Sequence, residues 1–413
     1  MVAKVVVGEN EELRLPGEQR GRWGLSPGVE FDVEETPQGL LLRRADPMLA
    51  RVYVEPTSGC NLSCRTCVRN SWSEPTGHME MDTYRGLIQG LRRVPSLEKV
   101  SFWGFGEPLL HPGILEMVAL AKGLGAQTQL ITNGLLLNRA MAEGLAAAGL
   151  DSLVVSVDGV SAEAYTDVRS GAKLGIVRQN VEGLRAACRA SPCRNPEIGL
   201  EFVVMRRNVG ELRNLRGLAC SMGASFIVLT NVMPYTEELS EEILYGLSGG
   251  SYQAVPSKWA PAIFLPKIDA RPEVTEALAR LLGYVGPPDP VQIRWDQTSG
   301  YCRFVNEGSA VVGWDGEVSP CIALMHSYAC YVMRRRKEIR RYTVGNVARD
   351  AITDIWMQSE FVRFRALVKK FDFAPCSDCG GCQLAETNEE DCFGNTFPVY
   401  GDCLWAKGVV QCP

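Results

Sequence analysis

The fifteen cysteines of this 413-residue chain are very unevenly distributed. Three of them, Cys60, Cys64 and Cys67, form one tight group, no cysteine occurs in residues 221–301, and nine occur in residues 302–413. The cytosol keeps thiols reduced, so clustered cysteines in a protein of that compartment indicate metal binding or catalysis. Because apolar residues make up 46% of the chain, most of it can bury a core, which excludes a small disulfide-held fold and a disordered chain.

The rest of the composition gives expectations about location and partners. The N-terminal sequence MVAKVVVGENEE lacks the apolar core of a signal peptide, and no apolar run reaches the ~18 residues of a membrane span. We therefore expect a cytoplasmic protein with no membrane partner. The formal net charge of −5 offers no basic field that would attract nucleic acid.

Residues 1–47 are predicted to be a separate small unit with short strands at residues 5–7 and 12–15, a helix at 17–23, and a hairpin of residues 30–35 with 40–44. The sequence LPGEQR followed by LSPGVEFDVEE resembles the swapped-hairpin (AbrB-like) fold of small DNA-binding regulators. That resemblance implies a homodimer formed by interleaved strands. The acidic charge of the segment argues against DNA binding, because duplex affinity rests on phosphate neutralisation. A docking or dimerisation module is the expected role.

Residues 50–246 alternate strand and helix patterns, which predicts a parallel α/β sheet because parallel strands need crossover connections. Apolar runs, expected where both faces of a strand are covered, occur at residues 51–55, 99–103, 127–132, 152–157, 199–205 and 225–229. Six such units predict a partial (β/α)6 barrel whose working face is the C-terminal end of the strands. Cys188 and Cys220 fall in helix patterns, and both are expected to be buried.

The remaining residues are divided into two segments. Residues 247–290 are rich in Gly, Pro and Ser and are predicted to connect across the barrel mouth, with one helix at 272–282. Residues 291–413 form the cysteine-rich domain, with helical character in residues 344–366. Loops tied by thiols need bound metal to be stable at this size.

The Cys60, Cys64 and Cys67 triplet directly follows the first expected strand, so it lies at the barrel mouth. Three thiolates on one short loop can bind three irons of a 4Fe-4S cluster and leave the fourth iron open to a small chelating molecule. Zinc is the weaker alternative, because a structural zinc site has four closed ligands. A redox disulfide would need only two thiols.

Three further motifs lie at the ends of successive expected strands: Gly104-Phe-Gly106-Glu107-Pro108, Thr132-Asn133-Gly134 and Ser156-Val-Asp158-Gly159. Arg169 with Gly171 follows the last of them. Together with the Cys-x3-Cys-x2-Cys triplet, these residues resemble the radical S-adenosylmethionine (SAM) superfamily. Each motif alone could be an ordinary loop, cap or surface arginine. One position departs from the family, since Thr66 stands where an aromatic residue often precedes the third cysteine. That position acts largely through its backbone.

The resemblance implies a set of ligand contacts and a reaction. Cys60, Cys64 and Cys67 would hold the SAM-binding 4Fe-4S cluster, whose reduction cleaves SAM to a 5′-deoxyadenosyl radical that removes a hydrogen atom from a substrate. The glycine-glutamate-proline motif would contact the SAM amino group, and the serine and arginine would hold its carboxylate. The implied SAM contacts are Gly104, Gly106, Glu107, Asn133, Ser156, Asp158 and Arg169. A structural cap is the alternative for Glu107.

The C-terminal cysteines resemble those of the SPASM domain, which usually houses two auxiliary 4Fe-4S clusters. The opening pattern Cys302-x13-Gly316-x4-Cys321 matches, but the later spacing departs from the usual one, so we expect one or two auxiliary clusters. The expected ligands are Cys302, Cys321, Cys376, Cys379, Cys382, Cys392, Cys403 and Cys412. Cys330 is the expected spare thiol, and a zinc ribbon over residues 376–382 is the alternative.

The whole chain resembles the radical SAM maturases that are associated with tungsten-cofactor oxidoreductases. The carrying segments are residues 60–72, 388–398, 403–405 and 411–413. This implies action on the cofactor or polypeptide of a tungsten-pterin aldehyde oxidoreductase, with an electron donor such as ferredoxin or flavodoxin. One alternative is a peptide-modifying maturase that forms thioether or carbon–carbon cross-links. Another is a non-catalytic iron–sulfur regulator. The sequence predicts no acid–base role for His111 or His326, and it identifies no proton donor.

Overall fold

The structure is a computed structural model of the chain. It describes residues 6–7, 13–14, 31–36, 39–44, 48–189, 195–246, 253–254, 261–283, 300–377 and 382–412. The strands predicted for residues 1–47 are present wherever the structure describes those residues. Strands β1 (Val6–Val7) and β2 (Leu13–Arg14) pair antiparallel, as do β3 (Phe31–Thr36) and β4 (Gly39–Arg44). The helix expected at residues 17–23 lies outside the described residues.

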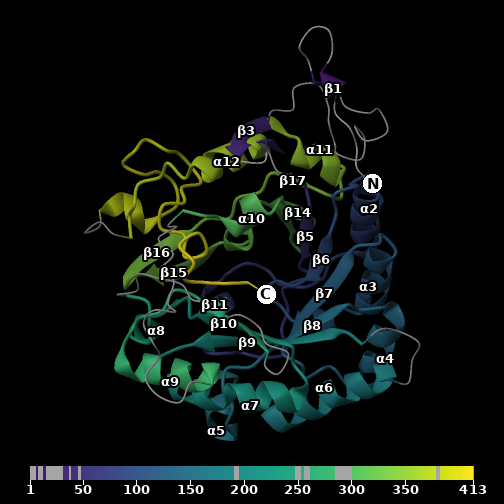
Figure 1. Cartoon of the computed structure of the whole chain (residues 1–413), viewed down its shortest axis with the longest axis vertical. Helices are drawn as coiled ribbons and strands as arrows, with labels where there is room; N and C mark the ends of the chain where they lie inside the picture. The colour runs from purple at the N-terminus through teal and green to yellow at the C-terminus, as the bar shows by residue number, and fades with distance from the viewer. Residues whose placement is uncertain are drawn as a thin grey trace.

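A curved sheet forms the centre of the molecule, with helices along its outer side (Figure 1). The six expected barrel strands are all present and pair in parallel in sequence order. They are β5 (Arg51–Val54), β6 (Lys99–Phe102), β7 (Gln127–Thr132), β8 (Ser152–Ser156), β9 (Glu197–Val204) and β10 (Phe226–Asn231). Their apolar side chains are buried, which agrees with the partial α/β barrel predicted from the sequence.

The sheet extends beyond these six strands on both sides. Strand β12 (Ala262–Phe264) pairs in parallel with β10, and β13 (Ser309–Val312) pairs in parallel with β5. The antiparallel strands β11 (Gln253–Ala254), β14 (Glu317–Ser319) and β17 (Gly345–Asn346) complete it. Residues 247–290 were expected to connect across the barrel mouth with one helix, but the described part of this segment also adds β11 and β12 to the sheet. Strands of two or three residues have no detectable periodicity, so the sequence did not predict them.

Helices of the expected length connect the strands, and α9 (Pro272–Leu282) matches its predicted bounds. The others on the outer arc are α2 (Met81–Leu91), α3 (Ile114–Lys122), α4 (Arg139–Ala148), α6 (Leu174–Arg189) and α7 (Leu212–Met222), while the short α5 (Ala162–Val168) was not predicted. Cys188 is buried as expected, but Cys220 is exposed. The expectation for Cys220 is wrong because α7 buries the neighbouring stripe of its surface, which includes Leu215, Leu218 and Ala219.

The C-terminal segment folds partly on this sheet and partly beside it. A hairpin of β15 (Tyr328–Val332) and β16 (Arg335–Ile339) is preceded by the short α10 (Arg303–Asn306) and followed by α11 (Ile352–Trp356) and α12 (Ser359–Lys370). The guanidinium carbon of the buried Arg365 lies 3.9 Å from the ring centre of Trp356, a cation–π contact between these two helices.

The last described residues return to the barrel mouth, where the C-terminus lies near the centre of the view in Figure 1. The Gln411 backbone N–H donates to Thr230 Oγ1 at 2.9 Å, and Asn231 Nδ2 donates to the Val409 carbonyl at 2.9 Å. Both partners lie at the end of β10, so residues 409–411 are fixed to the C-terminal edge of the sheet. Among the described residues, no helix has the length and apolar character to cross a membrane.

Packing of the outer helices can be tested at α4, where Leu145 has no solvent exposure. We expect Leu145→Ala to lower the free energy of unfolding by about 2–5 kcal/mol, because it removes buried methyl groups and leaves a cavity. Urea-induced unfolding would measure this. Arg139→Ala, at a side chain that is 91% exposed, is the control and should change the value by less than about 0.5 kcal/mol. Equal effects of the two substitutions would contradict the packing of α4.

Candidate functional site at the barrel mouth

The loop that carries Cys60, Cys64 and Cys67 connects β5 to the short 3-10 helix η1 (Val68–Ser71). The three thiols are partly exposed and line one cavity. Burial raises the pKa of Cys60, and it raises the pKa of Cys64 to about 11 despite the opposing charge of Arg169. Both side chains are therefore thiols in the free protein, so metal binding must release their protons.

The loop of residues 104–107 follows β6 and packs directly on the loop that follows β5. A Cβ atom at Gly106 would lie 2.0 Å from the Thr57 carbonyl oxygen, and one at Gly104 would lie 2.4 Å from the Glu55 side chain. Glycine is thus required at both positions by contact between two loops of the chain itself. The Glu107 N–H also donates to the Gly59 carbonyl at 2.8 Å.

The carboxylate of Glu107 is buried and accepts three hydrogen bonds from the chain. Its donors are Thr132 Oγ1 at 2.6 Å, the Asn133 N–H at 2.8 Å and the Leu109 N–H at 3.1 Å. The last of these makes Glu107 a cap of the following turn, which was the alternative expectation for this residue. An ionised carboxylate has about four acceptor positions, so about one remains for a further donor.

Asn133 also connects two loops of the site. Its Nδ2 donates to Asn61 Oδ1 at 2.8 Å, and its Oδ1 accepts from the Leu135 N–H at 3.0 Å. Since Asn61 lies between Cys60 and Cys64, the loop after β7 contacts the cysteine loop directly. The side chain of Asn133 therefore holds these two loops together.

Asp158 and Arg169 form a buried ion pair beside the cysteines. Arg169 Nη2 lies 2.9 Å from Asp158 Oδ2, and Asp158 Oδ1 accepts from the Val203 N–H at 2.9 Å. Burial lowers the pKa of Arg169, but the negative charge of Asp158 raises it, and the net shift is upward. Arg169 Nε is buried and has no hydrogen-bond partner in the described part of the chain. A group with acceptor oxygens would satisfy it.

These side chains surround one cavity of about 220 Å³ at the C-terminal edge of the sheet. The residues that the sequence predicted for it, and that line it, are Cys60, Cys64, Cys67, Gly104, Gly106, Glu107, Asn133, Ser156 and Arg169. Cys412, which was expected to bind an auxiliary cluster, lines it as well. Asp158 lies behind Arg169 and has no exposed surface. The structure thus brings the predicted motifs of four strands and the C-terminal end of the chain to a single site.

Comparison with known protein families agrees with this arrangement. Residues 54–202 match the family model for the radical SAM superfamily, and residues 302–383 match the SPASM model, an iron–sulfur cluster-binding domain. The tungsten-containing aldehyde ferredoxin oxidoreductase cofactor-modifying protein of Pyrococcus furiosus is 31% identical over 88% of this chain and 96% of its own length. The chain belongs to the radical SAM family with a SPASM domain.

Other relatives of this radical SAM enzyme differ in their named activities. A PqqA peptide cyclase of Xanthomonas campestris pv. campestris is 26% identical over 87% of this chain and 86% of its own length. Among solved structures, Streptococcus suis SuiB bound to S-adenosylmethionine has a TM-score of 0.53 and 13% identity, and covers 82% of this chain and 71% of its own. The structure of anSMEcpe with bound AdoMet has a TM-score of 0.51 and 17% identity, with 82% and 88% covered. These two structures support the fold.

Radical SAM domains bind a 4Fe-4S cluster and S-adenosylmethionine, and SPASM domains bind auxiliary iron–sulfur clusters, so these are the cofactors of this enzyme. The residues at the barrel mouth fit them. Three thiols supply the soft ligands that an iron–sulfur cluster needs. The unpartnered Nε of Arg169 supplies a buried donor next to them.

The predicted auxiliary cysteines fall into two groups. Burial raises the pKa of both Cys321 and Cys412; negative charge on Cys302 or Cys403 would raise that of Cys321 further, and negative charge on Cys403 would do the same to Cys412. These four thiols make up the first group. In the second group, the charge of Cys392 raises the pKa of Cys376, after the larger effects of burial and of Asp402. Cys382 is exposed, and Cys379 lies outside the described residues.

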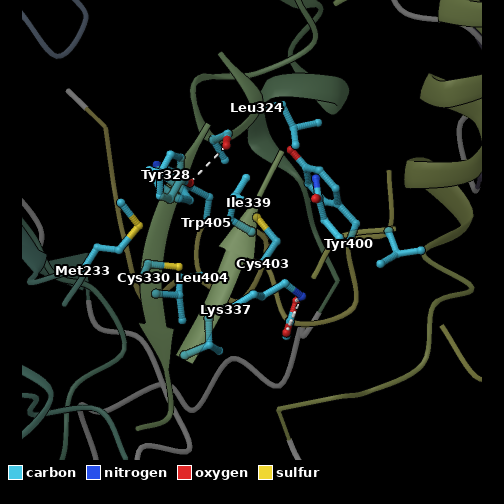
Figure 2. Close-up of a pocket in the computed structure, with 15 residues that line it drawn as sticks. Met233, Leu324, Tyr328, Cys330, Lys337, Ile339, Tyr400, Cys403, Leu404 and Trp405 are labelled. Carbon is cyan, nitrogen blue, oxygen red and sulfur yellow. Dashed lines mark hydrogen bonds and ion pairs between the residues drawn. The ribbon is translucent and has the colours of Figure 1, made fainter. Parts of the chain in front are cut away.

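Cys330, the expected spare thiol, is buried and lines a small cavity together with Cys403. Figure 2 shows Cys330 on β15 and Lys337 on β16, facing the loop that carries Cys403. Lys337 Nζ lies 2.7 Å and 2.8 Å from the two carboxylate oxygens of the equally buried Asp402. Because each charge is paired, the cavity wall has no isolated buried charge.

Sequence reasoning missed Glu201, which lines the main cavity from β9. Its Oε2 accepts from Ser156 Oγ at 3.1 Å. Burial and the nearby Asp158 raise the pKa of Glu201 to about 7, and the Ser156 hydrogen bond and Arg169 oppose them. The available signal was a single acidic residue in the apolar strand sequence IGLEFVV. A carboxyl group with this pKa can give or accept a proton near neutral pH.

The raised pKa of Glu201 predicts that the difference in stability between the wild type and Glu201→Gln depends on pH. An unfolded glutamate titrates near pH 4.3, so the folded protein holds this proton more tightly than the unfolded chain does. The associated stability is present at low pH and is lost as the pH rises through about 7. Glu201→Gln has a neutral side chain at every pH. The melting temperature of the variant minus that of the wild type should therefore rise from pH 5 to pH 7 and stay constant above pH 7. Melting curves that remain parallel from pH 5 to 8 would disprove the shift.

Proposed function

We propose that this enzyme cleaves S-adenosylmethionine reductively at the barrel-mouth cavity and acts in the maturation of a tungsten-pterin aldehyde oxidoreductase, on its cofactor or its polypeptide. When bound, the reduced cluster and S-adenosylmethionine supply a radical that removes a hydrogen atom from the substrate. The relation to the Pyrococcus furiosus cofactor-modifying protein, which extends over nearly the full length of both chains, is the observation that carries the choice of substrate.

In this proposal the chain's own residues bind and orient the two ligands. Cys60, Cys64 and Cys67 hold the cluster and leave one iron open to the cavity. The unpartnered Nε of Arg169 donates to the SAM carboxylate, and the ion pair with Asp158 keeps the guanidinium in place. The remaining acceptor position on the Glu107 carboxylate accepts a hydrogen bond from the SAM amino group.

Other residues in this proposal control the surroundings of the reaction. Apolar side chains on several strands and on the C-terminal segment line the cavity and exclude water from it, among them Leu62, Ile131, Met233 and Val410. Glu201 holds or releases a proton on the wall of the same cavity. Burial also raises the pKa of Glu107, which lines the same cavity.

We assign the auxiliary ligands from these charge interactions and from the spacing of the cysteines in the sequence. Cys302, Cys321, Cys403 and Cys412 are proposed to hold one auxiliary cluster, and Cys376, Cys382 and Cys392, with Cys379, a second. Cys412 also lines the main cavity, so the first of these clusters would lie beside the substrate. An electron donor such as ferredoxin or flavodoxin would supply the clusters, and the N-terminal unit would serve as the contact in a homodimer.

A peptide substrate is the second candidate, and the similarity to PqqA peptide cyclases favours it. In that case the enzyme would form a cross-link in a short precursor peptide. A non-catalytic iron–sulfur regulator is the third candidate, prompted by the hairpin unit at the N-terminus. Loss or retention of SAM cleavage separates this third candidate from the other two.

We expect Cys60→Ala to abolish SAM cleavage, because the cluster would lose one of its three protein ligands. The measurement is 5′-deoxyadenosine formed by anaerobically reconstituted protein with dithionite, together with iron content, which should fall by about four per chain. Cys220→Ala, at an exposed thiol of α7, is the matched control and should retain both. If the wild type makes no 5′-deoxyadenosine and Cys60→Ala changes nothing, the protein is not a radical enzyme.

The substrate can be tested by producing a tungsten aldehyde oxidoreductase with and without this enzyme. We expect oxidoreductase activity only in the presence of the wild type, and not with Cys60→Ala, because the radical step would be missing. Mass spectrometry of the oxidoreductase and of its extracted cofactor would locate the change. Full oxidoreductase activity without this enzyme, combined with cross-linking of a short precursor peptide, would favour the peptide substrate instead.

A further inference from the structure

His326 lies where three segments meet that are far apart in the sequence. Its imidazole is buried and stacks on the ring of Trp72, with 4.1 Å between the ring centres. His326 Nε2 is 2.9 Å from Glu55 Oε2, and His326 Nδ1 is 2.7 Å from Glu74 Oε2. Glu55 follows β5 and Glu74 follows the cysteine loop, whereas His326 belongs to the SPASM segment.

The two carboxylates require a charged imidazole. An ionised carboxylate only accepts hydrogen bonds, and a neutral imidazole has a single N–H donor. A neutral His326 would therefore place a nitrogen lone pair against one of the two glutamates. Burial by itself lowers the pKa of His326, but the hydrogen bonds and charges of Glu55 and Glu74 raise it to about 9. The side chain is an imidazolium at neutral pH.

Glu55 connects His326 to the loop of residues 104–107. Its second oxygen, Oε1, accepts from the Phe105 N–H at 2.9 Å. The loop touches the same side chain at Gly104, where even a Cβ atom would lie 2.4 Å from Glu55. Glu55 has no solvent exposure, so its carboxylate cannot turn toward water if its partner is lost. The position of this loop thus depends on where the Glu55 carboxylate is held.

Glu74 connects His326 to the segment that follows Cys67. Glu74 Oε1 accepts from the Ser327 N–H at 2.7 Å, next to the imidazole contact. Ser71 Oγ, at the end of η1, donates to the Ala329 carbonyl at 3.0 Å and adds a second tie between the same two segments. Hydrogen bonds therefore connect the residues around His326 to the segment that follows Cys67 as well as to the loop of residues 104–107.

We propose that His326 is a positioning residue for S-adenosylmethionine: its imidazolium, held between Glu55 and Glu74, fixes the loop of residues 104–107 relative to the cysteine loop. The SPASM segment thereby sets the geometry of the SAM site. The inference rests on the proposed function only in taking the loop of residues 104–107 as part of that site. The contacts of His326 themselves belong to the chain alone.

The test compares cluster-loaded wild type with His326→Gln, which removes the charge and one of the two donors. We expect SAM, monitored through the electron paramagnetic resonance spectrum of the reduced cluster, to bind on the order of tenfold more weakly to the variant. Amide hydrogen exchange of residues 103–107 should be faster as well. Tyr342→Phe is the control, because it removes a hydrogen bond to Glu360 within the C-terminal segment. It should leave both readouts unchanged.

A pH series separates positioning from general stabilisation. The charged groups that face the imidazole are Glu55 and Glu74, and Arg341, which is paired with Asp315, lies near Glu74. The wild type should lose SAM affinity as the pH rises through about 9, where His326 loses its charge, while His326→Gln should show no such step. If His326→Gln does not fold, Glu74→Gln makes the same test, and its step should move to lower pH.

The outcomes for this inference and for the proposed function are distinct. Wild-type protein that cleaves no SAM would refute the proposed function, but exchange at residues 103–107 would still report on His326. The positioning role would be overturned if His326→Gln and Glu74→Gln both kept the SAM affinity, the amide exchange rates and the pH profile of the wild type.

Discussion

The parallel pairing of the barrel strands determines where every group of the proposed site lies. Parallel strands end at the same edge of a sheet, so the loops after β5, β6, β7 and β8 must meet there. The three cysteines, the glycine-rich turn and the buried arginine are spread over residues 60–169 of the sequence. They share one cavity because their strands share one direction. The cavity-lining side chains of β9 and β10 reach the same edge for the same reason.

Each buried carboxylate that the structure describes at this edge has a hydrogen-bonding or charged partner within the chain. Glu107 accepts three hydrogen bonds, Asp158 faces Arg169, and Glu55 faces His326. An isolated charge in such surroundings would cost several kcal/mol, so each pair also fixes the loops that contribute it. The polar framework therefore exists before any ligand is added, and only single positions, such as Arg169 Nε, are left for one.

Most of the barrel and the cysteine loop could be predicted from the sequence, because apolar runs and motif spacing are local signals. The short strands β12 and β13 could not, since three or four residues have no period and their partners are remote in sequence. Glu201 was missed because one acidic residue in a strand resembles a surface position until the neighbouring strands are placed. Contact of Gly104 with Glu55 could not be predicted either, because it depends on how two loops pack, whereas the turn cap formed by Glu107 was one of the two predicted roles of that residue.

The pairing of β13 with β5 has a consequence for how the two domains of this family can be separated. The radical SAM match ends at residue 202 and the SPASM match begins at residue 302, yet the segment after residue 302 supplies a neighbour to the first barrel strand. Excision of the cysteine-rich part would uncover a row of unpaired backbone groups along β5, and such an open edge promotes association between chains. The barrel and the cluster-binding segment share one sheet in this protein, so a cut between them would pass through paired strands.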